Sequence, residues 1–145
     1  MSESAAYDFL KMCKEAGLVS SATSLDYSAR VFQMTISPFK QFCFRDMQPS
    51  VSETSDSYYV PWHNVQILLR IHNNGTDYLT ALSKLNAITE YAASIRNYTM
   101  TDGDKYLSAI VTRAATPLGE TSFEGKQGYL FSCDIRLTKD ITNDA

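Results

Sequence analysis

The sequence predicts an α+β fold: a single domain over residues 1–145 in which one mostly antiparallel or mixed β-sheet is flanked by an N-terminal helix and one long helix. Two observations carry this prediction. Along VQILLRIHNNGTDYLTALSKLNAITEYAASI, residues 65–95, the apolar period changes from alternation to every third or fourth residue. The predicted elements follow the order helix, three strands, long helix and two strands, and 145 residues with 44% hydrophobic content can bury one core.

The first element is a predicted helix over residues 1–17. Ser2 or Ser4 can cap its start, Glu3 or Asp8 suits its positive end, and Gly17 ends it. Residues 18–28 are small and polar and predict a connection. The residues at helical spacing, expected to face the core, are Ala6, Phe9, Leu10, Cys13 and Ala16.

Two strands are predicted next, over residues 31–36 and 41–45. Phe32, Met34 and Ile36 alternate with other residues in the first, as Phe42 and Phe44 do in the second. Ser37 and Pro38 break the run between them because proline cannot donate to a ladder. Residues 46–60 are rich in Ser, Asp and Glu and predict a long surface loop.

The stretch at residues 64–72 predicts a strand with one buried face, made by Val65, Ile67, Leu69 and Ile71. The period then changes, and a helix is predicted over residues 76–97. Asn74-Gly75 is therefore a strand-to-helix turn instead of a hairpin. The helix stripe is Tyr78, Leu82, Leu85, Ile88, Ala92 and Ile95.

The last third of the chain predicts a strand over 105–115, a loop over 116–128, a strand over 129–138 and a frayed tail over 139–145. The segment 105–115 is apolar on both faces, as a central or an interface strand would be. One proline and three glycines predict the loop. The face of the last strand that begins with Tyr129 and Phe131 is expected to be core, although an exposed aromatic face for RNA is the alternative.

The charge and composition limit the function. Lys and Arg number 13 against 16 Asp and Glu, a net charge of −3, which argues against broad capture of nucleic acid or an anionic membrane. The start lacks a signal-peptide pattern and no apolar run reaches 18 residues, so residence in the cytosol is expected. Cys13, Cys43 and Cys133 are widely separated and are expected to be reduced thiols.

No motif predicts catalysis, a cofactor or a metal. His63 and His72 are nine residues apart on one strand, which puts them on opposite faces. Asp102 and Asp104 resemble part of a calcium loop, but Arg113 stands where its distant acidic ligand would be, so a polar turn is expected. No glycine-rich phosphate cradle and no nucleophile elbow occur.

Aromatic residues concentrate where the predicted loop 46–60 meets the next strand. Tyr58, Tyr59 and Trp62 could anchor a partner protein or cap the edge of the core. Phe123 in the predicted loop 116–128 is a further candidate for a protein interface.

The arrangement resembles the tail terminator or tail-completion proteins of tailed bacteriophages, often called minor capsid proteins, with the lambda tail terminator as a type. The matching segments are VFQMTISPFKQFCFRDMQP, PWHNVQILLRIHNNGTDYLTALSKLNAI and GYLFSCDIRL, within residues 28–138. Pro61, Val65, Gln66 and Arg70, followed by the long helix, match the family pattern. The loop departs from it, because SVSETSDSYY has less glycine than the family pattern.

This resemblance implies a structural virion protein without enzymatic activity or cofactor, assembled in the host cytoplasm. It would form a ring, usually a hexamer, that caps the tail tube, joins it to the head connector or head-closure protein and lets genomic DNA pass without specific binding. Acidic residues are expected to line the channel. The alternatives are another phage connector or head-closure part, a tail tube protein, or a cytosolic α+β module that binds a small ligand.

Overall fold

A curled six-stranded sheet with two helices forms the protein, and the predicted α+β class is confirmed. The computed structural model describes residues 4–20, 26–32, 40–47, 62–72, 75–123 and 126–140. The strand order is β1-β2-β3-β6-β5-β4; β1 runs parallel to β2 and the other pairs are antiparallel, so the sheet is mixed. The elements are α1 (Ala5–Glu15), β1 (Ser28–Val31), β2 (Gln41–Met47), β3 (Trp62–His72), α2 (Gly75–Ser94), β4 (Arg96–Thr99), β5 (Lys105–Phe123) and β6 (Lys126–Lys139).

Helix α1 begins and ends where its capping residues predict. The Ser4 side chain accepts a hydrogen bond from the Tyr7 amide, which satisfies one of the free donors at the helix start. At the other end, Gly17 has φ of +77°, and the amides of Gly17 and Leu18 donate back to the carbonyls of Lys14 and Cys13. This pair of bonds is the glycine-terminated Schellman motif.

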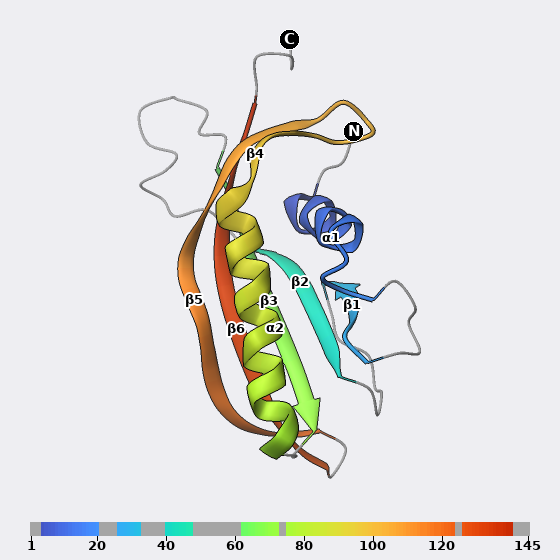
Figure 1. The fold of residues 1–145 in the computed structure, drawn as a ribbon, viewed down its shortest axis with the longest axis vertical. Helices are drawn as coiled ribbons and strands as arrows, with labels where there is room; N and C mark the ends of the chain where they lie inside the picture. Colours follow the sequence, from blue (N-terminus) through green and yellow to red (C-terminus); the bar gives the residue numbers. More distant parts are fainter. Residues whose placement is uncertain are drawn as a thin grey trace.

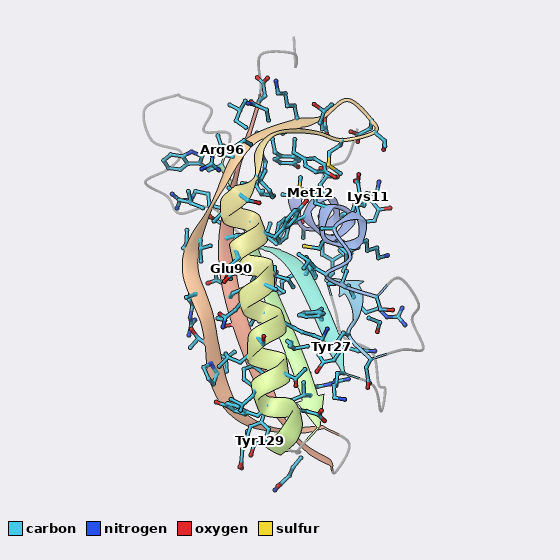
Figure 2. All side chains as sticks on the ribbon, in the orientation of Figure 1. Lys11, Met12, Tyr27, Glu90, Arg96 and Tyr129 are labelled. Atoms are coloured by element: carbon cyan, nitrogen blue, oxygen red, sulfur yellow. The ribbon has the colours of Figure 1, made fainter. Side chains whose placement is uncertain are left out.

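Both helices pack on the same face of the sheet (Figure 1). Phe9 of α1 lies 5.8 Å from Phe44 of β2, and Tyr78 of α2 lies 5.0 Å from Phe131 of β6. Phe9 also stacks on Tyr91, so α1 lies beside the second half of α2. Figure 2 shows Met12, which is fully buried, on the inner side of α1 and Lys11 on its outer side. The core-facing sheet residues include Phe42, Phe44, Val65, Ile67, Leu69, Ile71, Phe131, Cys133, Ile135 and Leu137.

The structure describes only the first two residues of the predicted strand over 31–36. Val31 ends strand β1, which covers Ser28–Val31 and so begins in the predicted connection, and Phe32 is not in a strand. Residues 33–36 lie outside the described part of the chain. Phe32 follows the strand with φ of +74° and is 59% exposed, and its amide donates a hydrogen bond to the Phe44 carbonyl. Ala16, expected in the core, is exposed beyond the last turn of α1.

The predicted loop 46–60 begins too early, because Asp46 and Met47 continue β2 against Val65 and Asn64. Strand β3 likewise begins at Trp62, two residues before the predicted start. The residues between Met47 and Trp62 lie outside the described part of the chain.

The predicted long helix ends three residues early, and a strand absent from the prediction follows. Helix α2 stops at Ser94, and Arg96 and Asn97 belong to β4, which pairs with the start of β5. A tight turn joins the two strands: Gly103 has φ of +97°, and the Asp102 side chain accepts from the Asp104 amide. Asp102 and Asp104 thus form the expected polar turn.

The predicted loop 116–128 is wrong over most of its length, because β5 extends to Phe123 and β6 starts at Lys126. Pro117 is tolerated because β4 ends opposite Ser108, so Pro117 has a partner strand on one side and the missing N–H interrupts no second ladder. The pairing of β5 with β6 shifts register around Arg113 and between Pro117 and Gly119, and these irregularities let β5 continue through this segment. Lys139, expected in the frayed tail, is the last residue of β6.

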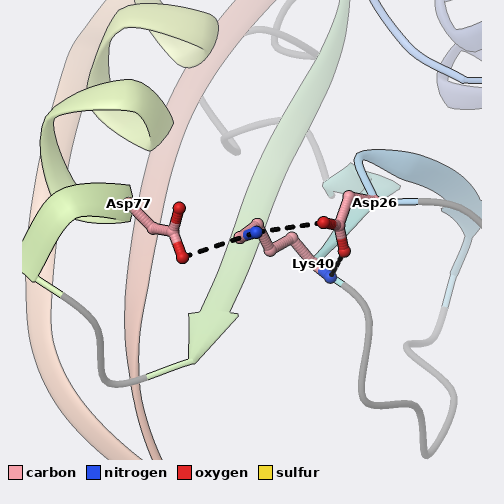
Figure 3. Close-up of polar contacts among 3 residues, drawn as sticks. All are labelled: Asp26, Lys40 and Asp77. Carbon is pink, nitrogen blue, oxygen red and sulfur yellow. Dashed lines mark hydrogen bonds and ion pairs between the residues drawn. The ribbon is translucent and has the colours of Figure 1, made fainter.

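One side chain ties the beginning of α2 to β1 and β2. Lys40 lies 3.0 Å from Asp26 and 3.4 Å from Asp77 (Figure 3), while its amide donates to Asp26. Its side chain is only 15% exposed. The ammonium group therefore crosslinks the segment before β1, the start of β2 and the first turn of α2.

Candidate interaction surface

The sheet has a second face, and in the described part of the chain neither helix lies on it. The register places there the residues that alternate with the core residues of β1, β2, β3 and β6, together with Ile110 and Arg113 of β5. We call this surface the open face, and only its end near Met47, Trp62 and Ile110 is exposed. The buried residues on it are Ser28, Gln41, Cys43, Arg70 and Ser132. Residues that pair across the strands form rows on this face. One row is Met47, Asn64, Arg136 and Ile110, and the neighbouring row is Arg45, Gln66, Asp134 and Arg113.

Three large apolar side chains are exposed at one end of the open face. Met47 is 39% exposed, Trp62 38% and Ile110 53%. Met47 and Ile110 belong to the same row, and Trp62 lies two residues from Asn64, the β3 residue of that row, on the same face. We call these three residues the apolar patch. Methionine, tryptophan and arginine are the residue types enriched in protein interfaces, so this composition favours contact with protein.

The Trp62 ring is held in place before any partner arrives. The Arg136 guanidinium lies 4.5 Å from the ring centroid, and its Nε donates to Asn64 at 3.2 Å. The ring therefore has one side covered by a cation and limited freedom to rotate. A fixed aromatic side chain loses little conformational entropy on binding, which suits an anchor.

Arginines dominate the charge around the apolar patch. The charged side chains placed on the open face have a formal charge of +4, and one of them, Arg70, is buried. They are Arg30, Arg45, Arg70, Arg113, Arg136 and Asp134. Arg45 donates to Gln66 at 2.6 Å. Burial raises the pKa of Asp134, while Arg113, the hydrogen bond from Gln66 and Arg45 oppose that rise. Because the whole chain carries −3, all other residues together carry −7.

Of the four interface candidates from the sequence, the structure describes one side chain. Trp62 is exposed at the start of β3, as a partner anchor would be. Tyr58 and Tyr59 lie outside the described residues. Phe123 is the last residue of β5 instead of a loop residue, and its side chain is not described. The sequence did not single out Met47, Ile110 or Arg136, because they lie near Trp62 only through the pairing of four strands, β2, β3, β6 and β5.

A second group of polar residues lies on the helix side of the sheet, around the start of α1. Tyr106 donates to the buried Asp8 carboxylate at 2.7 Å, and Lys139 lies 3.5 Å from the buried Asp104. His63 joins this group: burial, and then Lys139, lowers the pKa of His63, while Asp46 and Asp8 oppose that change. The hydrogen bond between Tyr106 and Asp8 joins α1 to β5, so this cluster holds α1 to the sheet.

The thiols are poor nucleophiles. Cys13, Cys43 and Cys133 are all free and buried. Burial raises the pKa of Cys133 to about 12, and it raises the pKa of Cys13 and Cys43 as well. Among the described residues, no group of three or more His, Cys, Asp or Glu side chains has the geometry of a metal site.

Comparison of the chain with protein-family models, with curated proteins and with solved structures finds no match in any of the three. Within the described ranges, neither helix combines the length and the apolar character that crossing a membrane requires.

Proposed function

We propose that this protein is a structural, non-catalytic subunit of a phage virion: a tail terminator at the neck, which forms a ring, caps the tail tube and joins it to the head connector. Segments within residues 28–138 resemble the tail terminator proteins, and this resemblance suggests the function. It also implies a hexameric ring, a location in the virion and no cofactor. In this proposal genomic DNA passes through the ring and no membrane is involved.

One observation favours a role in assembly over the alternative function, a module that binds a small ligand. The open face carries an exposed apolar patch around a tryptophan that Arg136 holds in place, on a sheet face that neither helix covers in the described chain. A subunit that works alone gains nothing from exposing Met47, Trp62 and Ile110 together, because such patches favour association. A ring subunit needs protein-facing surfaces of this kind.

The charge of the chain is compatible with a passage for DNA. The net charge of −3 gives a weak average repulsion from phosphate, which keeps a channel from holding DNA. We therefore expect acidic residues to line the channel.

The test is the mass of the purified protein in solution. Light scattering coupled to gel filtration, over a wide concentration range, is run on the chain alone and mixed with the cognate tail tube protein. A closed ring of about six 16.2 kDa subunits in either condition supports the proposal. A chain that stays monomeric in both conditions contradicts it and favours the small-ligand-binding module instead.

A further inference from the structure

We infer that the exposed end of the open face, around the apolar patch, is the surface on which this subunit docks a different protein of the virion. The docking surface of that partner carries carboxylates around an apolar centre. This inference rests on the proposed function and adds to it the place and the chemistry of the contact with a neighbouring protein. It follows from which side chains are exposed at this end and from the charges beside them.

The exposed side chains limit the contact to one end of the sheet. The three residues of the apolar patch are each at least 38% exposed, whereas Gln41, Cys43 and Ser132, further along the same face, are buried. Between these two groups lies the row that begins with Arg45. A partner can therefore reach the apolar patch and this row, and the contact is centred on Trp62.

The charge at this end calls for an acidic partner. Arg45 and Arg113 are exposed, and Arg136 is partly buried beside the Trp62 ring. Asp134, itself partly buried, is the only carboxylate in the two rows that contain these arginines. Three arginines against one aspartate leave +2. Carboxylates are the protein groups that guanidinium pairs with best, since both are planar and can form two parallel hydrogen bonds.

The apolar patch favours a protein over a nucleic acid. Phosphate would pair with the arginines, but Met47 and Ile110 gain only when other apolar groups cover them. Proteins that bind single strands stack bases on aromatic faces, and here the Arg136 guanidinium already covers one face of the Trp62 ring, 4.5 Å from its centroid. A fixed aromatic side chain with apolar and arginine neighbours is instead the composition of a protein hot spot.

The same charge disfavours a symmetric contact between two copies of this chain. A twofold contact through this end would bring the arginines of one copy against those of the other, and like charges across an interface are unfavourable. A different protein has no such restriction, because its own sequence sets the charge of its surface.

The test measures the binding of the full chain to two probes, the cognate tail tube protein and the cognate head connector protein, by biolayer interferometry. Ile110→Glu places a carboxylate in the apolar patch, and Arg113→Glu reverses a charge in the neighbouring row. The matched controls are Leu79→Glu on α2 and Lys14→Glu on α1, because both positions are exposed and both helices lie on the other side of the sheet (Figure 1). Circular dichroism and urea unfolding verify that each variant folds.

We expect Ile110→Glu and Arg113→Glu to raise the Kd for one of the probes by about tenfold or more, while the two controls leave it unchanged. The Kd of the wild type should also rise between about 50 mM and about 500 mM NaCl, because salt screens the pairs between arginine and carboxylate. Trp62 is the single tryptophan of the chain, so a fluorotryptophan label gives one fluorine NMR signal from the apolar patch. This signal should shift when the probe binds.

A probe that binds Ile110→Glu and Arg113→Glu as tightly as the wild type overturns the inference and leaves the proposed function intact. If the two variants bind the probe normally but no longer form the ring, the occupant is a second copy and the inference is wrong. Binding of the wild type to duplex DNA that Arg113→Glu abolishes, with probe binding unchanged, would assign the surface to nucleic acid and also overturn the inference. A wild type that binds neither probe overturns both proposals together.

Discussion

The phenolic hydroxyl of Tyr106 donates a 2.7 Å hydrogen bond to the carboxylate of Asp8, and both side chains are almost fully buried. This bond joins the first turn of α1 to β5 across 98 positions of sequence. Burial, and then the bond to Asp8, raises the pKa of Tyr106, so the phenol stays protonated and remains a donor.

Replacing Tyr106 with Phe removes this donor and leaves the ring in place. We expect the free energy of unfolding to fall by about 1–3 kcal/mol, because a buried carboxylate loses a hydrogen-bond partner. Urea unfolding at pH 7 measures the change. Tyr7→Phe is the matched control, since Tyr7 is on the same helix and 43% exposed, and it should alter stability little. Equal effects of the two changes would contradict the structural role of the bond.

Asp46 acts as a second cap for α1 from outside the helix. Its carboxylate accepts from the Ser4 hydroxyl at 2.6 Å and from the Ala6 amide at 2.9 Å. We expect Asp46→Ala to cost about 1 kcal/mol, the usual loss for a cap. Because Ser4 and Asp46 contact each other, the double change with Ser4→Ala should cost less than the two single changes added together. Urea unfolding measures these losses of stability, with Glu90→Ala on α2 as the control. Losses that simply add would show that the two caps act separately.

Lys40 is the partner of both Asp26 and Asp77. We expect Lys40→Met to lower the free energy of unfolding by about 0.5–1 kcal/mol at low salt, because the ion pairs are partly exposed to solvent. The difference should shrink in about 1 M NaCl, because salt screens the ion pairs of the folded wild type. Lys14→Met, at an exposed position of α1, is the control. A loss that is independent of salt would assign the effect to packing of the lysine stem.

The sequence predicted elements well where a regular period coincides with one buried face. Val65, Ile67, Leu69 and Ile71 are all buried as expected, and Gly17 ends α1 because it adopts a positive φ. The apolar period predicts these elements because one face of each helix or strand is buried away from water.

The failures occur where tertiary pairing overrides local signals. Pro117 and Gly119 predict a loop locally, but pairing with β6 on one side keeps them in β5. Strand β4 is too short to show a period, and it exists because it pairs with Lys105–Ser108. The open face has the same origin: Met47, Ile110 and Arg136 become neighbours only through the register of four strands. No local pattern contains that register.

His63 should make stability depend on pH. Its pKa is lowered in the folded protein, mainly by burial, so the unfolded chain takes up a proton at a higher pH than the folded chain. Wild-type stability should therefore be complete above about pH 6.5 and should fall as the pH decreases below that value. His63→Gln removes this contribution and keeps a polar side chain of similar size.

The measurement is urea unfolding of wild type and His63→Gln between about pH 7.5 and about pH 5. Carboxylates titrate in both proteins, so the difference between them isolates the histidine. We expect wild type to lose stability relative to the variant as the pH falls. A difference that stays constant, or that grows in favour of wild type, would contradict a lowered pKa.

Phe32 combines a backbone conformation that favours glycine with a large exposed side chain. Its φ of +74° is in the left-handed region, where a Cβ costs about 1 kcal/mol or more. We expect Phe32→Gly to be more stable than Phe32→Ala by about 1 kcal/mol, because both lose the ring and only glycine loses the strain. At Ser83, exposed within α2, the order should reverse, since alanine is the better helix former there. Urea unfolding of the four variants measures these differences in stability. If Phe32→Ala is as stable as Phe32→Gly, or more stable, the backbone relaxes at no cost and the strain is absent.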